Sequence, residues 1–146
     1  MPSPDAPPVR VRGLLARVLA VVTAGYTAFL VWATHHPRPE FLLGPNPPSD
    51  KTLHFIAYGG LAVLAAGTLA LARHWTPPRS AVLAGVLAIF AAVDEITQPF
   101  FKRSSEPLDW VYDCLGIGLG IVAVAAAVAV VRLVRGRQAQ LGVGGR

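Results

Sequence analysis

The sequence predicts an all-α membrane protein of one domain, a bundle of four transmembrane helices, and three observations support this fold class. Of the 146 residues, 53% are hydrophobic and only 14% are charged, whereas soluble domains carry about 25% charged residues. Four apolar stretches approach the ~20 residues needed to cross ~30 Å of hydrocarbon. The connections between them are short and rich in proline or polar residues.

The four predicted helices cover residues 14–33, 53–72, 80–98 and 108–131. Residues 34–49 contain five prolines, which predicts a loop because proline interrupts helices. Pro77 and Pro78 lie in the turn before the third helix, and residues 99–107 join the last two.

The ends of the chain are predicted to lie outside the bundle. We expect a flexible N-terminal tail at residues 1–13, a transmembrane domain at 14–132 and a flexible basic C-terminal tail at 133–146. The first apolar run, at about 17–20 residues, exceeds the ~7–15 of a cleavable signal peptide, so it predicts an uncleaved anchor.

The basic residues predict that both ends of the chain face the cytoplasm. An even number of helices puts the termini on one side, and cytoplasmic segments carry the excess of Lys and Arg. This orientation places nine basic residues inside and four outside, the latter being Arg38, Lys51, Lys102 and Arg103. It also explains the net charge of +5 without nucleic acid, because no basic stripe with interleaved aromatic residues is present.

Three polar clusters interrupt the apolar chain at the predicted outer ends of the helices. They are Asp50, Lys51, His54 and Tyr58; Asp94, Glu95 and Gln98; and Arg103, Asp109 and Asp113. A helical rise of ~1.5 Å per residue places Asp94 level with Asp113 and Gln98 level with Asp109. Ionisable residues avoid lipid, so these stripes predict one acid-rich polar pocket, open to the outer side.

Acidic residues outnumber basic ones in and beside these clusters. Lys51, Lys102 and Arg103 oppose six carboxyl groups, on Asp50, Asp94, Glu95, Glu106, Asp109 and Asp113. A partly buried site with this surplus is expected to protonate a carboxyl group, to bind a cation or to receive a cationic ligand group. His54 could also take up a proton.

His54, Asp94 and Asp113 are the candidates for catalysis or ligand binding. We expect Asp94 to face the centre of the pocket and Glu95 to pair with Arg103 or Lys51, because neighbouring residues point ~100° apart on a helix. The alternative is that the acidic pair fixes helix packing. His54 is either a general base or ligand, or a ring held by Asp50 or Asp94.

Other polar residues also have more than one functional interpretation. A metal site built from His54, Asp94 and Asp113 would suit divalent ions, but in the absence of a second histidine we predict no metal and no other cofactor. Lys51 and Arg103 either hold a phosphate or carboxylate, or neutralise the nearby acids. The histidines outside the predicted helices are expected to be solvated, namely His35, His36 and His74.

Glycines in the fourth helix permit a close helix contact. Gly116 and Gly120 form a GxxxG pair, the spacing that lets two helix backbones approach each other. We assign the pair to packing within the bundle in preference to dimerisation.

Several spaced motifs resemble those of one family. The residues from Asp50 to Tyr58 match Asp-Lys-x-x-His-x-x-x-Tyr, and those from Asp94 to Gln98 match Asp-Glu-x-x-Gln. An Arg-Ser pair follows at Arg103, and the residues from Asp109 to Gly116 follow Asp-x-x-x-Asn-x-x-Gly. In this order the motifs resemble the VanZ-like family of small bacterial membrane proteins.

The chain departs from the family pattern at two places. Asp113 stands where the family has Asn, and Phe100-Phe101-Lys102 precedes Arg103 where the family tends to have a Pro-Gly turn.

The resemblance implies a multi-pass protein of the bacterial cytoplasmic membrane, linked to cell-envelope function or to resistance against the glycopeptide teicoplanin. Three molecular activities stay open. The pocket is a non-enzymatic binding or structural site that acts through a lipid or protein partner, or it is an active site for the phospho-head group of a lipid or lipid-linked envelope precursor. A small transporter is less favoured, because four helices are few and no inverted repeat is found. The bilayer is an expected partner and nucleic acid is not, and the oligomeric state stays open.

Overall fold

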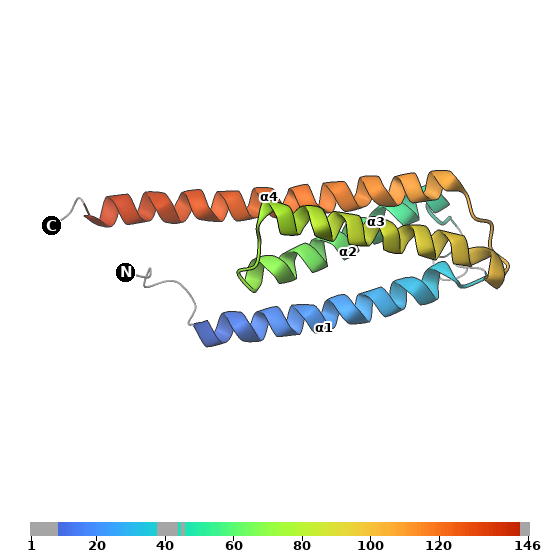
Figure 1. Ribbon diagram of the computed structural model, residues 1–146, viewed down its shortest axis with the longest axis horizontal. Helices are drawn as coiled ribbons and strands as arrows, with labels where there is room; N and C mark the ends of the chain where they lie inside the picture. Colours follow the sequence, from blue (N-terminus) through green and yellow to red (C-terminus); the bar gives the residue numbers. More distant parts are fainter. Residues whose placement is uncertain (1–8, 38–43, 45, 144–146) are drawn as a thin grey trace.

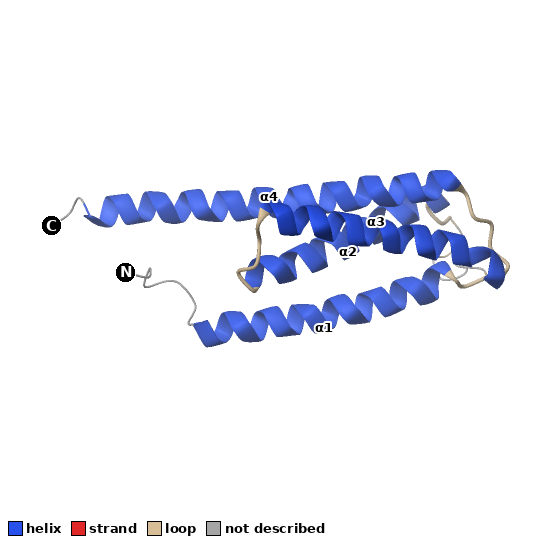
Figure 2. Cartoon of the chain, viewed as in Figure 1, coloured by secondary structure: helices blue, strands red, loops and turns tan. Residues whose placement is uncertain are grey.

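The chain folds into four long helices and one short 3-10 helix in the computed structural model, which describes residues 9–37, 44 and 46–143. The helices are α1 Val9–Thr34, α2 Asp50–Leu71, α3 Pro77–Thr97, η2 Gln98–Phe101 and α4 Pro107–Val143. Successive long helices run in opposite directions, so α1 begins and α4 ends at the same end of the bundle (Figure 1). No strand occurs among the described residues (Figure 2). The predicted all-α fold class is confirmed.

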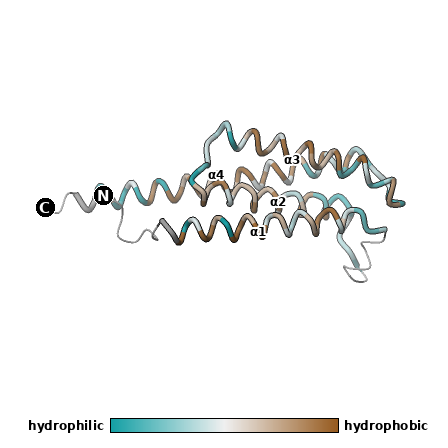
Figure 3. The backbone as a smooth tube through the Cα atoms, turned by 60° about the horizontal axis from the view of Figure 1, so that its bottom comes forward, coloured by the Kyte–Doolittle hydropathy of each residue, from teal (hydrophilic) through white to brown (hydrophobic). Residues whose placement is uncertain are grey.

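All four long helices are long and apolar enough to cross a membrane. At most 28% of the residues in the apolar stretch of any one of them are buried. Large apolar side chains point outward instead, with Val21 73%, Val82 67% and Val122 63% exposed. Brown, hydrophobic colouring dominates the middle of the helices, and teal recurs at their ends (Figure 3). Apolar surface on this scale is unfavourable in water but suits a bilayer.

The helices begin and end where local chemistry satisfies their terminal backbone groups. The Ser49 hydroxyl accepts a hydrogen bond from the Thr52 N–H and caps α2, and Thr76 does the same for α3 ahead of Pro77 and Pro78. At the end of α2, Arg73 adopts a left-handed conformation with φ of 63°, and the His74 N–H donates to the Leu69 carbonyl oxygen at 2.8 Å.

All four long helices extend beyond their predicted bounds. α2 and α3 each begin three residues early, at Asp50 and Pro77, so Pro77 and Pro78 lie in the first turn of α3 and not in the turn before it. α1 begins at Val9, inside the predicted N-terminal tail, and α4 continues to Val143 through most of the segment 133–146 that was predicted to be a flexible tail. This segment contains no proline and is rich in residues of high helix propensity. The apolar run located the membrane span but not the end of the helix. Residues 1–8 and 144–146 lie outside the described chain.

Glycines bring α2 and α4 into close contact along the bundle. A Cβ atom added to Gly120 would lie 2.7 Å from the carbonyl oxygen of Gly59, and one added to Gly116 would collide with the carbonyl oxygen of Phe55. Both contacts are with backbone, which cannot rotate aside. The assignment of the GxxxG pair to packing within the bundle is therefore confirmed.

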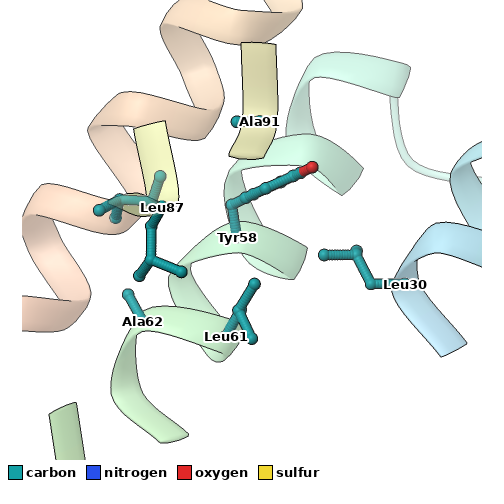
Figure 4. Close-up of a cluster of buried hydrophobic side chains, with 7 residues drawn as sticks. Leu30, Tyr58, Leu61, Ala62, Leu87 and Ala91 are labelled. Carbon is teal, nitrogen blue, oxygen red and sulfur yellow. The ribbon is translucent and has the colours of Figure 1, made fainter. Parts of the chain in front are cut away.

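A small apolar core fills the space between the helices beside this seam. It contains Leu30 from α1, Tyr58, Leu61 and Ala62 from α2, Leu87 and Ala91 from α3, and Ile117 from α4. The hydroxyl group of Tyr58 points away from Leu61 and Ala62 (Figure 4). Tyr58 is fully buried, so its ring completes the apolar core while its hydroxyl belongs to a polar layer beyond it.

Candidate functional site

Seven of the ten predicted site residues are buried together at the end of the bundle where α2 and α4 begin, which we call the polar end. They form the polar centre, which consists of His54, Tyr58, Asp94, Glu95, Gln98, Asp109 and Asp113. None of them is more than 5% exposed. The other three predicted residues, Asp50, Lys51 and Arg103, form ion pairs around this centre. The structure thus brings all ten together.

His54 and Asp113 form the contact that joins α2 to α4 in the polar centre. The Nδ1 atom of His54 lies 3.0 Å from Oδ1 of Asp113, and the two side chains are 3% and 1% exposed. The Gly116 and Gly120 seam holds the helix backbones close enough for this contact. Asp113 thereby orients the ring of His54, whereas the sequence predicted Asp50 or Asp94 in that role.

Glu95 lies at the heart of the polar centre, so the prediction that it would pair with Arg103 or Lys51 is wrong. Ligand atoms of His54, Glu95 and Asp113 all lie within 4.8 Å of one another. One oxygen of Glu95 accepts a hydrogen bond from the Glu106 N–H at 2.8 Å, and the other has no partner. The helical twist does separate Asp94 from Glu95, but Glu95 is the residue turned towards α2 and α4.

Asp94 faces α1 instead. Its Oδ1 accepts a hydrogen bond from the Thr34 hydroxyl at 2.9 Å and lies 3.4 Å from Nδ1 of His35, while its Oδ2 has no partner. The Tyr58 hydroxyl lies close enough to Asp94 to interact with it electrostatically. Asp94 therefore links α1 to the polar centre.

Thr34 and His35 belong to the site, although no sequence pattern indicated Thr34 and His35 was predicted to be solvated. Nε2 of His35 lies 2.9 Å from the Thr97 hydroxyl, and its Nδ1 lies 2.8 Å from the Val31 carbonyl oxygen. The His35 side chain is only 13% exposed. The reason is that α1 runs to Thr34, which carries both residues to the end of α3.

Ion pairs cover the polar centre. Both Asp50 oxygens accept hydrogen bonds from Nη2 of Arg103, at 2.8 and 3.0 Å, and Nη1 of Arg103 donates to the Thr34 carbonyl oxygen at 3.0 Å. Nζ of Lys51 lies 2.8 Å from Glu106 and 3.6 Å from Asp109. Lys51 and Arg103 therefore neutralise nearby acids, which is one of the two alternatives predicted for them. The predicted open pocket is wrong, because these pairs close the described part of the site.

The Asp50–Arg103 pair separates two cavities. One, of about 300 Å³, is lined by Ser104 and prolines of the preceding loops. The other, of about 220 Å³, is apolar and is lined by α1, α2 and His54. Asp50, Leu53 and Arg103 line both. The pair and Leu53 therefore lie between the outer cavity and the cavity beside His54.

Three carboxyl groups have no lysine or arginine beside them, although His35 lies beside Asp94 and His54 contacts Asp113. Of the six acids counted in the sequence, Asp50, Glu106 and Asp109 contact Arg103 or Lys51. The other three are Asp94, Glu95 and Asp113, and each has one buried oxygen without a hydrogen-bond partner. Both polar atoms of the Gln98 side chain and the Tyr58 hydroxyl are likewise buried without partners. The acid surplus predicted from the sequence is thus concentrated in the most buried part of the site.

Among the described residues, two groups of side chains have the geometry to hold a metal ion. One is His54, Glu95 and Asp113, and the other is Asp50, His54 and Asp109, with the ligand atoms of each group within 4.8 Å of one another. Imidazole and carboxylate ligands suit several divalent ions. Asp94 belongs to neither group. The metal site considered from the sequence combined His54, Asp94 and Asp113, and in the structure Glu95 replaces Asp94 in this combination.

The η2 turn offers a stability test next to this site. Lys102 has a left-handed backbone with φ of 62°, a conformation that costs a non-glycine residue about 1 kcal/mol. We expect Lys102→Gly to raise the unfolding free energy by roughly that amount, measured by thermal unfolding of the purified chain. Lys102→Ala keeps the strained conformation and serves as the control. Equal stabilisation by both variants would contradict the backbone explanation.

Comparison of the chain with protein-family models, with curated proteins and with solved structures found no match. The function is therefore argued from the site itself.

Proposed function

We propose that this chain is a VanZ-like multi-pass protein of the bacterial cytoplasmic membrane, and that its polar centre binds a positively charged or hydrogen-bond-donating group of a ligand. The ligand would arrive from the outer side, and its binding would serve a cell-envelope function such as teicoplanin resistance. The observation that carries this proposal is the set of three buried carboxyl groups without a lysine or arginine beside them, Asp94, Glu95 and Asp113.

The free energy of these groups favours a ligand over a purely structural network. Each buried acceptor without a partner costs about 1–3 kcal/mol, and more if it is charged. A network that only held helices together would be expected to satisfy its members. A ligand group with N–H donors or positive charge would stabilise Glu95 and Asp113, whose ligand atoms lie within 4.8 Å of each other. The Asp50–Arg103 pair lines the outer cavity through which this group would arrive.

Two structural features support the resemblance. The motif residues come from three helices, yet they converge on one site. Lys102, in the segment before Arg103 where the family tends to have a Pro-Gly turn, has the left-handed backbone that glycine adopts readily.

Expression of the chain in a teicoplanin-sensitive bacterium tests the proposal. We expect the wild-type protein to raise the inhibitory concentration of teicoplanin, and Asp94→Asn to lose this protection at unchanged membrane abundance. Asp113→Asn restores the residue of the family but removes one of the three carboxyl groups, so it is expected to weaken the protection without abolishing it. An antibiotic with a cytoplasmic target serves as the control. No protection by wild-type protein at normal abundance would contradict the envelope role.

Labelling of introduced cysteines tests the proposed orientation. Cys114 is the one cysteine in the sequence, so a Cys114→Ser background is free of thiols. In intact cells we expect a membrane-impermeant maleimide to label Ser104→Cys, at the polar end, but not Gln138→Cys near the end of α4. Both positions are exposed. Labelling of Gln138→Cys alone would show that the orientation is the reverse of the one proposed.

An enzyme acting on a phospho-head group is the second candidate. The contact between His54 and Asp113 favours it, because a carboxylate that orients a histidine is the arrangement of a general base. It predicts that His54→Ala abolishes activity and that expression changes the profile of extracted lipids. An unchanged lipid profile in cells that show teicoplanin protection would reject this candidate and leave the binding role.

A further inference from the structure

A third cavity lies at the end of the bundle opposite the polar centre. This is the end where α1 begins and α4 ends (Figure 1). Its volume is about 800 Å³, within the range of roughly 300–1,000 Å³ typical of ligand sites. Its walls come from α1, α2, α4 and the turn after α2. They are mainly apolar, and small residues such as Gly67 and Ala127 leave the space open.

Four arginines line this cavity: Arg12, Arg73, Arg132 and Arg135. Within the described part of the chain their side chains make no ion pair and no hydrogen bond. All six acidic residues of that part lie in the polar centre or the ion pairs around it, at the far end. An apolar cavity with an uncompensated positive rim complements an amphiphile that carries a negative head group.

Arg73 supplies a separate indication. It holds a left-handed backbone conformation, with φ of 63°, at the position after a helix where glycine is usual. Arginine is strained there, and strain of this kind tends to occur at functional positions. The guanidinium group that lines the cavity offers a reason for arginine at this position.

We propose that this cavity, the arginine pocket, binds an anionic phospholipid, with the phosphate among the arginines and an acyl chain along the apolar walls. A second copy of the chain is a poor occupant, because its own arginine-rich end would repel this one. Under the orientation proposed above, the pocket opens to the cytoplasmic leaflet, where basic pockets between helices bind anionic head groups. The site itself does not depend on the function proposed for the polar centre.

Lipid retention by the purified full chain tests the proposal. Native mass spectrometry would compare phosphatidylglycerol with phosphatidylcholine of the same acyl chains. We expect the double variant Arg132→Gln and Arg135→Gln to weaken phosphatidylglycerol binding by roughly tenfold or more, since each arginine near the head group contributes roughly fivefold. The matched control removes two charges outside the pocket, with Arg79→Gln and Arg137→Gln.

Two further variants separate the pocket from a merely basic surface. Ala127→Trp fills the apolar wall without changing the charge, and we expect it to weaken phosphatidylglycerol binding too. Arg73→Gly relieves the backbone strain, so it should weaken binding while the unfolding midpoint stays the same or rises.

Four results would overturn the arginine pocket. They are equal binding of the two lipids, equal weakening by the control double variant, unchanged binding in Ala127→Trp, and altered self-association in place of altered lipid binding.

Discussion

Replacing Gly116 with valine is expected to lower the unfolding free energy by at least about 3 kcal/mol, because the new side chain has no space. A Cβ atom at this position collides with the Phe55 carbonyl oxygen and lies 3.0 Å from the Gly59 nitrogen. The backbones of α2 and α4 would have to separate. Since the same seam sets the 3.0 Å contact between His54 and Asp113, the polar centre would be lost with it.

Gly118 provides the control on the same helix. A Cβ atom there meets nothing within 4 Å, so Gly118→Ala should be neutral or slightly stabilising, because alanine favours the helix by about 1 kcal/mol. Membrane abundance and the thermal unfolding midpoint of the full chain measure both variants. A folded Gly116→Val protein at normal abundance would show that the seam is not required.

Replacing Glu95 with glutamine is expected to raise the unfolding free energy, by about 1–3 kcal/mol, in the protein without ligand. The amide oxygen can still accept the hydrogen bond from the Glu106 N–H. A ligand atom of Asp113 lies within 4.8 Å of one of Glu95, and both residues have a buried oxygen without a hydrogen-bond partner. The substitution therefore removes a buried acid and adds a hydrogen-bond donor beside Asp113.

Glu106→Gln is the matched control, because it makes the same chemical change in a side chain that is 54% exposed. Its ion pair with Lys51 is a surface pair, so the expected loss is below about 1 kcal/mol. Thermal unfolding in the same detergent compares the two. Destabilisation by Glu95→Gln beyond that of Glu106→Gln would mean that the carboxylate holds the bundle together.

The helices could be predicted from the sequence because a bilayer imposes a simple rule, about 20 apolar residues for each crossing. Their ends were harder to predict. The segment from Arg132 onward is polar, yet it continues α4, since helix propensity and hydrophobicity are independent properties. Of the described prolines, Pro37, Pro47 and Pro48 lie outside the helices as predicted, because proline interrupts a helix. Pro77 and Pro78 instead begin α3, since the first turn of a helix tolerates proline.

Which ionisable residues of the helices belong to the site could also be predicted, because ionisable residues on apolar helices must turn inward. The partners within it could not. Asp94 and Glu95 exchanged their expected directions, since a rotation of α3 by a fraction of a turn decides which of two neighbours faces α2. Arg103 pairs with Asp50 and also contacts Thr34. Both contacts depend on how the loops return to the bundle. The spacing of residues along a helix contains no such information.

The most direct test of the polar centre as a ligand site is the teicoplanin protection given by Glu95→Gln, divided by the amount of folded protein in the same membranes. The protection given by the wild-type protein is measured first and serves as the reference. We predict that the variant is at least as abundant as the wild type and that its protection is lost. Protection equal to that of the wild type per folded molecule would contradict the ligand site.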